Sequence, residues 1–337
     1  MAHLTVALAG LGTTGTHVVR HLVDGELGGL LPVDRPLRLR LPDRHVEDQA
    51  RAERIIAGRV PVEFSPVVGE QPPDVAILAT PCRTHVSVAT ELLRAGSHVV
   101  SISDSPEDVI ELLALDELAR ANGRSLVVGA GMAPGLSCLL ARLAGDQLDE
   151  VDAISIAKAG TAGPACARQH HQALKRPGRD WAGQGWELRA GGSGRDLAWF
   201  PEPIGARDCY RGALPSPILL HRRYPEAQRL SARVSATRRD RLTSRLPMLR
   251  KPHQDGGPGA VRADVRGWRD GAVETIVYAV AAFPSAAAAA VAVGAALRAA
   301  RGGAPMGAAG LSEWPNPNEV LADVRRLGIS ISTFTGS

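Results

Sequence analysis

The chain has 337 residues, of which 45% are apolar and 22% charged, and its formal net charge is +4. This length suits about two domains with large cores, so stability does not require disulfides or a structural metal. No run of about 20 uncharged apolar residues occurs, which argues against a membrane span, and the first residues lack the pattern of a signal peptide. We therefore expect a cytoplasmic protein.

The basic residues are concentrated in the second half of the chain. Residues 1–150 contain 13 basic and 20 acidic residues, whereas residues 151–337 contain 26 and 15. Only Lys158, Lys175 and Lys251 are lysines, and aromatic residues make up 4%, so nucleic-acid binding is not expected. The arginines are expected to face a carboxylated small substrate or an acidic neighbouring subunit. The four cysteines form no CxxC pair, which predicts free thiols and no metal site.

The first 135 residues alternate short apolar runs with amphipathic segments. The apolar runs predict strands at residues 4–9, 37–41, 74–80, 99–102 and 126–128. Helical spacing predicts helices around residues 18–23, from Thr84 as N-cap to Gly96, from Pro106 to about Gly123, and after residue 135 to about Leu143. Strands that alternate with helices predict crossover connections and hence an α/β fold with a doubly wound parallel sheet.

The first predicted turn carries the pattern GxGxxG at Gly10, Gly12 and Gly15. The first glycine permits a tight turn, the second lets the backbone approach a pyrophosphate, and the third lets the helix pack closely on the strand. The helix N-terminus adds amide donors and positive potential. We therefore predict a dinucleotide site formed by residues 10–15, including Leu11, Thr13 and Thr14. A glycine turn without a ligand is the alternative.

Asp43 follows the second predicted strand, where a carboxylate suits the ribose diol of NAD. The adjacent Arg44, with Arg38 and Arg40 nearby, can instead neutralise the 2′-phosphate of NADP. NAD and NADP therefore both remain open as cofactors, and Asp43 as a solvated loop carboxylate is the alternative.

The second half offers several candidate catalytic and binding residues. Histidine titrates near neutrality, so His170 or His171 can exchange a proton with an amine or alcohol, and Arg168 can hold a carboxylate. A polar helix surface or a subunit contact is the alternative for all three. Asp104 follows a strand at the edge where open α/β sheets bind ligands, and a loop or capping carboxylate is its alternative. Tyr210 is a candidate substrate contact and proton donor, with burial as the alternative.

The same half predicts a second folding unit. A strand is expected at residues 153–157, and two strands at 261–266 and 273–281 surround the turn Asp270-Gly271, which predicts an antiparallel pair. Residues 285–300 form an alanine-rich segment that predicts a closely packed helix.

From Val75 to Arg142 the sequence resembles the saccharopine dehydrogenase-like oxidoreductases. The resemblance is carried by TPCRTH at residues 80–85, AGSHVV at 95–100, Ser103-Asp104, LDE at 115–117 and GMAPGLS at 131–137. Diaminopimelate dehydrogenases have a related glycine-proline-glycine turn, and the TPxxxH pattern is similar to that of glucose-fructose oxidoreductase-like enzymes. The chain departs from the family at Ala133, where relatives commonly have an aspartate that meets a substrate amine.

The resemblance implies a Rossmann domain at residues 1–135 and a second α/β domain with an open mixed sheet at 136–283. It further implies that residues 284–337 form a C-terminal helix and tail that return to the Rossmann domain. Ala79, Thr80 and Pro81 are then expected near the nicotinamide, with His85 orienting their loop, and Met132 near the substrate. A homodimer is expected as well.

These observations together predict an NAD(P)-dependent oxidoreductase that acts on a C–N bond of a small, carboxylated substrate, by imine reduction or by amine or amino-acid oxidation. A sugar or alcohol oxidoreductase is one alternative. A dinucleotide-binding partner protein without catalysis is another, because Ala133 replaces the family aspartate.

Overall fold

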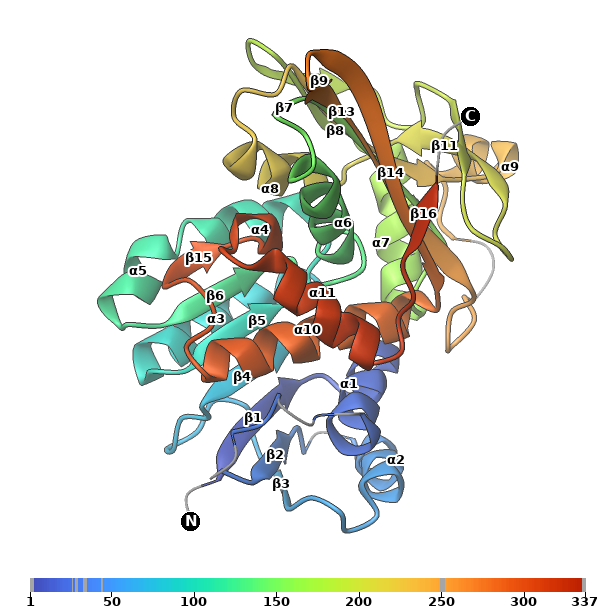
Figure 1. Cartoon of the computed structure of the whole chain (residues 1–337). Helices are drawn as coiled ribbons and strands as arrows, with labels where there is room; N and C mark the ends of the chain where they lie inside the picture. The colour runs from blue at the N-terminus through green and yellow to red at the C-terminus, as the bar shows by residue number, and fades with distance from the viewer. Residues whose placement is uncertain are drawn as a thin grey trace. The chain divides into compact units, whose positions relative to one another are not determined.

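The computed structural model describes residues 3–25, 27, 30–32, 35–43, 45–248 and 252–334. These residues divide into two compact units, drawn in Figure 1. Unit 1 comprises residues 3–103, 107–131 and 288–328, and unit 2 comprises residues 104–106, 132–287 and 329–334.

Unit 1 is built on a parallel sheet with the strand order β15-β6-β5-β4-β1-β2-β3. Its strands are β1 (Leu4–Ala9), β2 (Leu37–Leu41), β3 (Val62–Phe64), β4 (Val75–Leu78), β5 (His98–Ser101), β6 (Ser125–Val128) and β15 (Gly307–Ala309). The strands β4, β5 and β6 are buried along their whole length, as expected for parallel strands covered on both faces. The strand order reverses between β1 and β4, which makes the sheet doubly wound as predicted.

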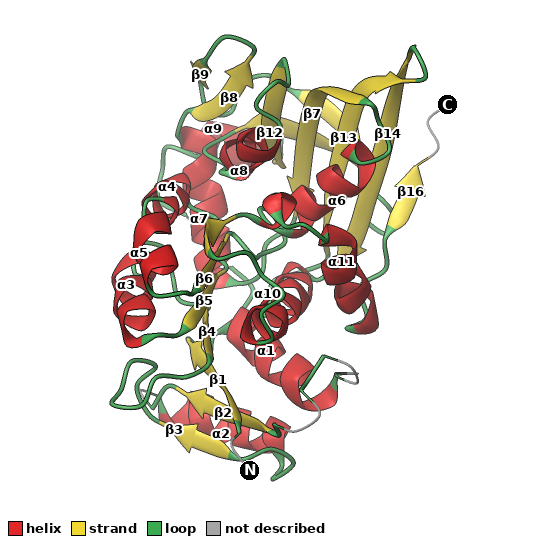
Figure 2. Ribbon diagram, turned by 60° about the vertical axis from the view of Figure 1, so that its left-hand side comes forward, coloured by secondary structure: helices red, strands yellow, loops and turns green. Residues whose placement is uncertain are grey.

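Helices cover both faces of this sheet. They are α1 (Thr13–Asp24), α2 (Val46–Ile56), α3 (His85–Ala95), α4 (Pro106–Leu113), α5 (Asp116–Ala121), α10 (Pro284–Ala300) and α11 (Pro317–Arg326), with the 3₁₀ helix η1 (Leu311–Glu313). In Figure 2, α3 and α5 lie on one side of the strands and α1 and α10 on the other. The alanine-rich segment forms α10 as predicted, and its small side chains are almost all buried.

One local expectation for unit 1 was wrong. The single helix predicted from Pro106 to about Gly123 is divided into α4 and α5. At the start of α5 the carboxylate of Asp116 accepts a hydrogen bond from the amide of Ala308 on β15, at 2.8 Å, a contact that helical periodicity does not encode. Thr84 is the N-cap of α3 as predicted, but its hydroxyl donates to the carbonyl of Pro81, at 2.8 Å, and makes no capping bond to the helix.

Unit 2 is built on a mixed sheet with the order β10-β11-β12-β7-β13-β14-β16, to which the hairpin of β8 and β9 is added beside β12. Its strands are β7 (Glu150–Ala159), β8 (Gly178–Ala182), β9 (Trp186–Arg189), β10 (Asp196–Trp199), β11 (Ala206–Arg211), β12 (Arg229–Ser235), β13 (Gly259–Arg269), β14 (Ala272–Ala282) and β16 (Ser332–Phe334). Only β7 and β12 run parallel, and the other pairs are antiparallel. The open mixed sheet is therefore confirmed.

The helices of unit 2 are α6 (Leu136–Gly145), α7 (Pro164–Lys175), α8 (Ser216–Arg223) and α9 (Arg238–Thr243). The helix α6 packs on β7, β13 and β14. The predicted antiparallel pair is confirmed as β13 and β14, which are joined by Asp270 and Gly271 with φ of +51° and +78°. Two residues with positive φ form the tight turn that suits the twist of a hairpin.

The C-terminal segment contributes to both units. Residues 288–328 lie in unit 1, where β15 extends the parallel sheet beside β6. Residues 329–334 lie instead in unit 2, because β16 pairs with β14. The sequence-based division, which places all of residues 284–337 with the Rossmann domain, differs from the structure at this point.

Candidate functional site

The glycine turn in unit 1 lies where the strand order reverses. Gly10 has φ of +99°, and a Cβ there would lie 2.6 Å from the carbonyl oxygen of Ala79. A Cβ on Gly15 would lie 2.0 Å from the carbonyl oxygen of Gly10. Glycine is therefore required at both positions, because a side chain at residue 10 would overlap the loop after β4 and a side chain at residue 15 would overlap the backbone of the turn.

Gly12 differs from the other two glycines, because a Cβ at this position would meet no atom within 4 Å. Gly12 is the N-cap of α1, where no side chain caps the helix and the first turn contains no acidic residue. Free space beside the positive end of a helix is what a pyrophosphate requires. The residues of this turn therefore fit a dinucleotide.

The loop that follows β4 is fixed by two buried side chains. His85 is fully buried, with Nε2 2.9 Å from the carbonyl oxygen of Thr80 and Nδ1 2.9 Å from the hydroxyl of Ser101. The carboxylate of Asp108 accepts the backbone N–H of Arg83 with both oxygens, at 3.0 and 2.9 Å. Arg83 has φ of +73°, an uncommon conformation that Asp108 stabilises. Residues 79–85 are thus held in one conformation beside the glycine turn.

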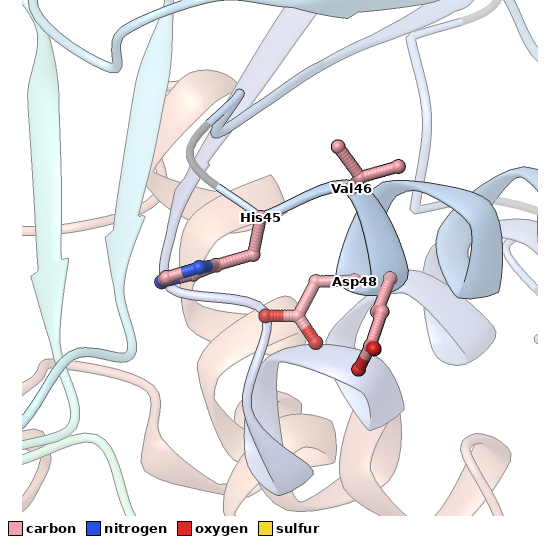
Figure 3. A pocket seen from close by; sticks show the side chains of 4 residues that line it. His45, Val46 and Asp48 are labelled. Carbon is pink, nitrogen blue, oxygen red and sulfur yellow. The ribbon is translucent and has the colours of Figure 1, made fainter.

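A surface hollow lies at the start of α2, lined by His45, Val46, Glu47 and Asp48 (Figure 3). Arg51, one turn further along α2, donates to the carbonyl of Leu11 at 2.7 Å and pairs with Asp48. The helix α2 is thereby tied to the glycine turn. Asp43 is exposed just before this hollow, and Arg44 lies outside the described residues.

Unit 2 contains the buried Lys158 and three half-buried titratable side chains, Asp104, Cys166 and His170, which the sequence did not identify as a set. Lys158 on β7 is 7% exposed, and its Nζ lies 3.4 Å from a carboxylate oxygen of Asp104. Burial disfavours the charged amine, but Asp104 and the nearby Cys166 outweigh it, so the pKa of Lys158 is raised. Burial, and next the charge of Asp104, raise the pKa of the Cys166 thiol, which favours its neutral form. Asp104 is therefore the anion that pairs with Lys158.

His170 on α7 belongs to the same group. Its Nε2 donates to the carbonyl of Ser235 at 3.0 Å, whereas the buried Nδ1 has no hydrogen-bond partner within the part of the chain that the structure describes. Burial and the charge of Lys158 lower the pKa of His170 to about 4. The imidazole is therefore neutral near pH 7, and Nδ1 offers an unused lone pair.

The other candidates in unit 2 are placed differently. His171 lies 2.9 Å through Nε2 from the carbonyl of Leu246, and the side chain of Arg168 is exposed. Tyr210 is buried, with the guanidinium of Arg241 5.4 Å from its ring, and Met132 is buried too. The structure therefore brings Asp104 into contact with Lys158. His170 is linked to Lys158 only through the effect of the lysine charge on its pKa. Among the described residues, no hydrogen bond or ion pair joins Arg168, His171 or Tyr210 to this pair. The sequence contains one indication that Lys158 is special, because it is one of only three lysines among 39 basic residues.

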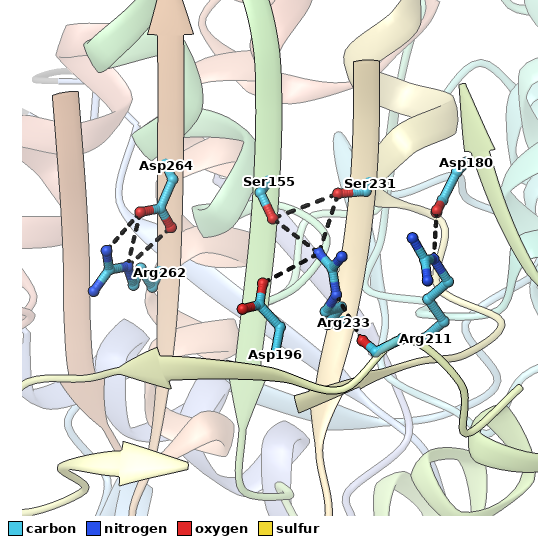
Figure 4. Close-up of polar contacts among 9 residues, drawn as sticks. Ser155, Asp180, Asp196, Arg211, Ser231, Arg233, Arg262 and Asp264 are labelled. Carbon is cyan, nitrogen blue, oxygen red and sulfur yellow. Dashed lines mark hydrogen bonds and ion pairs between the residues drawn. The ribbon is translucent and has the colours of Figure 1, made fainter. Parts of the chain in front are cut away.

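One face of the sheet in unit 2 carries polar side chains that bond to one another (Figure 4). Arg262 and Asp264 on β13 form a bidentate pair, and Arg233 on β12 donates to Ser155 at 3.3 Å and to Ser231 at 3.4 Å. Arg262 and Asp264 are only 19% and 30% exposed. The opposite face of the sheet carries apolar side chains that are buried, namely Ile154, Ile156, Val261, Ala263 and Val265.

No helix among the described residues combines the length and apolar character needed to cross a membrane.

The chain has the fold of a known dehydrogenase. Neither a protein-family model nor a curated protein sequence matches it. Among solved structures it is similar to apo saccharopine dehydrogenase (L-Glu forming) from Saccharomyces cerevisiae, with a TM-score of 0.68 and 14% identity over 98% of this chain and 100% of that chain. It is also similar to C. glutamicum DAP dehydrogenase in complex with DAP, with a TM-score of 0.50 and 18% identity over 96% and 99% of the two chains. The resemblance predicted from the sequence is thus confirmed for the fold: this chain has the Rossmann-type sheet and second mixed sheet of saccharopine dehydrogenase.

Proposed function

We propose that this protein is an NAD(P)-dependent oxidoreductase that acts on a C–N bond of a small, carboxylated substrate, by imine reduction or by amine or amino-acid oxidation. The observation that carries the proposal is the open space beside Gly12. Gly12 lies at the start of α1, where no side chain caps the helix and the first turn contains no acidic residue, while Gly10 and Gly15 on either side are tightly packed.

The dinucleotide is held by residues of unit 1 in this proposal. The backbone of Gly10, Leu11, Gly12, Thr13, Thr14 and Gly15 receives the pyrophosphate, and Asp43 and Arg44 are the proposed contacts to the adenosine ribose. Ala79, Thr80 and Pro81 receive the nicotinamide end, with His85 supporting their loop. When bound, the nicotinamide exchanges a hydride with the substrate.

The C–N specificity is supported by two kinds of likeness. The segment from Gly131 to Ser137 resembles the junction of saccharopine dehydrogenase-like enzymes. Two of the solved structures with a similar fold are named for saccharopine and for DAP. A carboxylated substrate is supported by the basic excess of residues 151–337 and by the exposed Arg168, the proposed anion anchor. Met132 and Tyr210 are the other proposed substrate contacts, and Asp104, His170 and His171 the proposed proton carriers.

The cofactor proposal is tested by two glycine variants with opposite expectations. Gly12→Val places a side chain in the open space, so the melting temperature should stay close to that of the wild type while NADH affinity, measured by fluorescence titration, falls by at least about tenfold. Gly15→Ala serves as the control for packing, because its Cβ would overlap the carbonyl of Gly10, and it should lower the melting temperature. A wild-type protein that binds neither NADH nor NADPH would disprove the proposal.

The substrate class is tested by a panel of amines and alcohols. Amino acids, saccharopine and meso-diaminopimelate are supplied with NAD⁺ or NADP⁺, and sugars and alcohols with matched carboxylates form the second group. Reduction of the cofactor by amines supports C–N chemistry. Reduction only by hydroxyl compounds identifies a sugar or alcohol oxidoreductase, and tight binding without any reduction identifies a dinucleotide-binding partner protein.

We further infer that two copies of the chain associate and that the protein works in the cytoplasm. Trp268 and Val273 face each other across β13 and β14, and each is 45% exposed, an unusual arrangement for large apolar side chains that remain in water. All four cysteines are free thiols, which suits a reducing compartment.

A further inference from the structure

Lys158 is a buried lysine in a chain that uses arginine almost everywhere else. Of 39 basic residues only three are lysines, and Lys175 on α7 is exposed, whereas Lys158 is 7% exposed. Arginine retains its proton under all ordinary conditions, while the amine of lysine gains and loses a proton readily when its surroundings change. A lysine at this position can therefore donate a proton, which an arginine there could not.

We propose that Lys158 is the general acid of the reaction and that Asp104 holds its ammonium group in place. This proposal rests on the proposed function and names the proton donor for it. The ammonium Nζ and the carboxylate Oδ2 are 3.4 Å apart, and both side chains are largely withdrawn from solvent. Both residues belong to unit 2.

One hydrogen-bonding atom of His170 is not used by the described residues. Its Nδ1 is buried and has no partner among them, and the charge of Lys158 contributes to the lowered pKa of this ring. A buried acceptor left unpaired is unfavourable, so such atoms usually meet a water molecule or a ligand. The ammonium of Lys158 is the donor, and Nδ1 of His170 the acceptor, that this unit offers to a hydroxyl or amine group.

A purely structural role explains the pair less well. Withdrawal of two charges from water is unfavourable, and a buried ion pair often stabilises a fold no more than apolar residues of the same size do. Burial opposes the charged amine, but its interactions, chiefly with Asp104, outweigh burial and raise the pKa of Lys158, so the amine is protonated at neutral pH. A raised pKa also makes it a weak acid, so it can give its proton only to a group that becomes strongly basic, such as a leaving hydroxyl. Cys166 is the third neighbour, and its raised pKa leaves it as a neutral thiol.

The proton is needed when a carbonyl compound and an amine have combined to a neutral carbinolamine. Lys158 donates its proton to the hydroxyl oxygen, the C–O bond breaks, water leaves, and the nitrogen lone pair forms the C=N bond. The product is an iminium ion, and Lys158 is left as a neutral amine beside Asp104. The carbon then takes a hydride, for which the proposed reduced nicotinamide is the donor, and Lys158 regains its proton from solvent.

The first experiment compares Lys158→Met, Lys158→Arg and the control Lys175→Met. Methionine fills a similar volume without a proton, and arginine retains the charge beside Asp104 but does not release a proton. With saccharopine and NAD⁺ or NADP⁺ as probes, both variants at position 158 should lower kcat at least about 100-fold, a typical effect of losing the group that exchanges this proton. NADH affinity should stay within about twofold of the wild type, since these variants leave the glycine turn intact.

The second experiment needs no turnover. With ¹³Cε-labelled lysine the protein gives three lysine signals, and the signal of Lys158 is the one that Lys158→Arg removes. Because the charge of Asp104 raises the pKa of Lys158, we expect Asp104→Asn to lower the pH at which this signal titrates. A signal that does not respond to Asp104→Asn would overturn the proposal.

The outcomes separate this proposal from the proposed function. A wild-type protein that binds no dinucleotide refutes the proposed function, whatever the titration shows. A wild-type protein that turns over the probes while Lys158→Met retains kcat within about threefold refutes the role of Lys158 alone. If Lys158→Met lowers kcat while Lys158→Arg keeps the wild-type value, the charge of residue 158 has a structural role. That outcome also refutes the role of Lys158 as a general acid.

Discussion

His85 Nε2 lies 2.9 Å from the carbonyl oxygen of Thr80, five residues earlier in the chain. A carbonyl only accepts, so Nε2 carries the hydrogen, and the ring is fixed from its other side by the hydroxyl of Ser101. The histidine therefore connects the loop after β4 to the end of β5. It holds the loop that is proposed to receive the nicotinamide.

Replacement of His85 by alanine should weaken dinucleotide binding more than the loss of stability explains. Two hydrogen bonds of about 0.5–1.5 kcal/mol each disappear, so NADH affinity should fall about tenfold at a temperature where the variant is still folded. The measurement is a fluorescence titration together with thermal unfolding. Ser87→Ala, on the exposed side of the same helix, is the control and should change neither value. Unchanged affinity in a destabilised His85→Ala protein would show that the bond serves stability alone.

Glu47 should favour NAD over NADP. Glu47 and Asp48 both line the hollow at the start of α2. Asp48 forms an ion pair with Arg51, whereas no ion pair between Glu47 and an arginine is found among the described residues. An exposed charge is screened, so Glu47→Gln should improve NADPH affinity only by about twofold to fivefold and leave NADH affinity unchanged. Glu53→Gln, further along α2, is the control. Equal gains for both nucleotides would mean that the hollow does not distinguish the 2′-phosphate.

The stability of the fold should fall as the pH is lowered from about 6.5 to about 4. Burial lowers the pKa of His170 from 6.5 to about 4, so the unfolded chain binds more protons than the fold in this range. The contribution is on the order of 1–3 kcal/mol near pH 7 and is lost progressively below pH 6.5. Urea unfolding at several pH values should show a shallower decline for His170→Gln, whose amide retains a donor for Ser235.

His171→Gln provides the comparison for that measurement. Its side chain is only partly buried and bonds to Leu246 outside the group around Lys158. The decline of the wild type should persist in this variant. Parallel curves for the wild type and His170→Gln would show that another group governs the acid response.

Trp268→Glu should dissociate the proposed dimer. A charge at this half-exposed position opposes burial against a second copy, while the hairpin turn at Asp270 and Gly271 remains intact. Light scattering after size exclusion should report half the mass of the wild type. Leu188→Glu on the exposed strand β9 is the control and should keep the wild-type mass. A monomeric wild type would end the dimer proposal directly.

The sequence by itself determined the local elements and the nucleotide turn. Runs such as Leu4–Ala9 and Val75–Leu78 are apolar throughout because parallel strands are buried on both faces, and this pattern is local. The glycines at 10 and 15 were equally readable, because only glycine tolerates the close approaches measured there. Family likeness added the second mixed sheet.

Only the tertiary structure decided which distant side chains meet. Asp104 and Lys158 are 54 residues apart, and neither hydropathy nor spacing connects them. The carboxylate of Asp116 at the start of α5 likewise accepts a hydrogen bond from the amide of Ala308, 192 residues away. Local periodicity reflects the burial of each segment, whereas pairing across the sheet depends on strand order and register, which emerge only when all segments pack together.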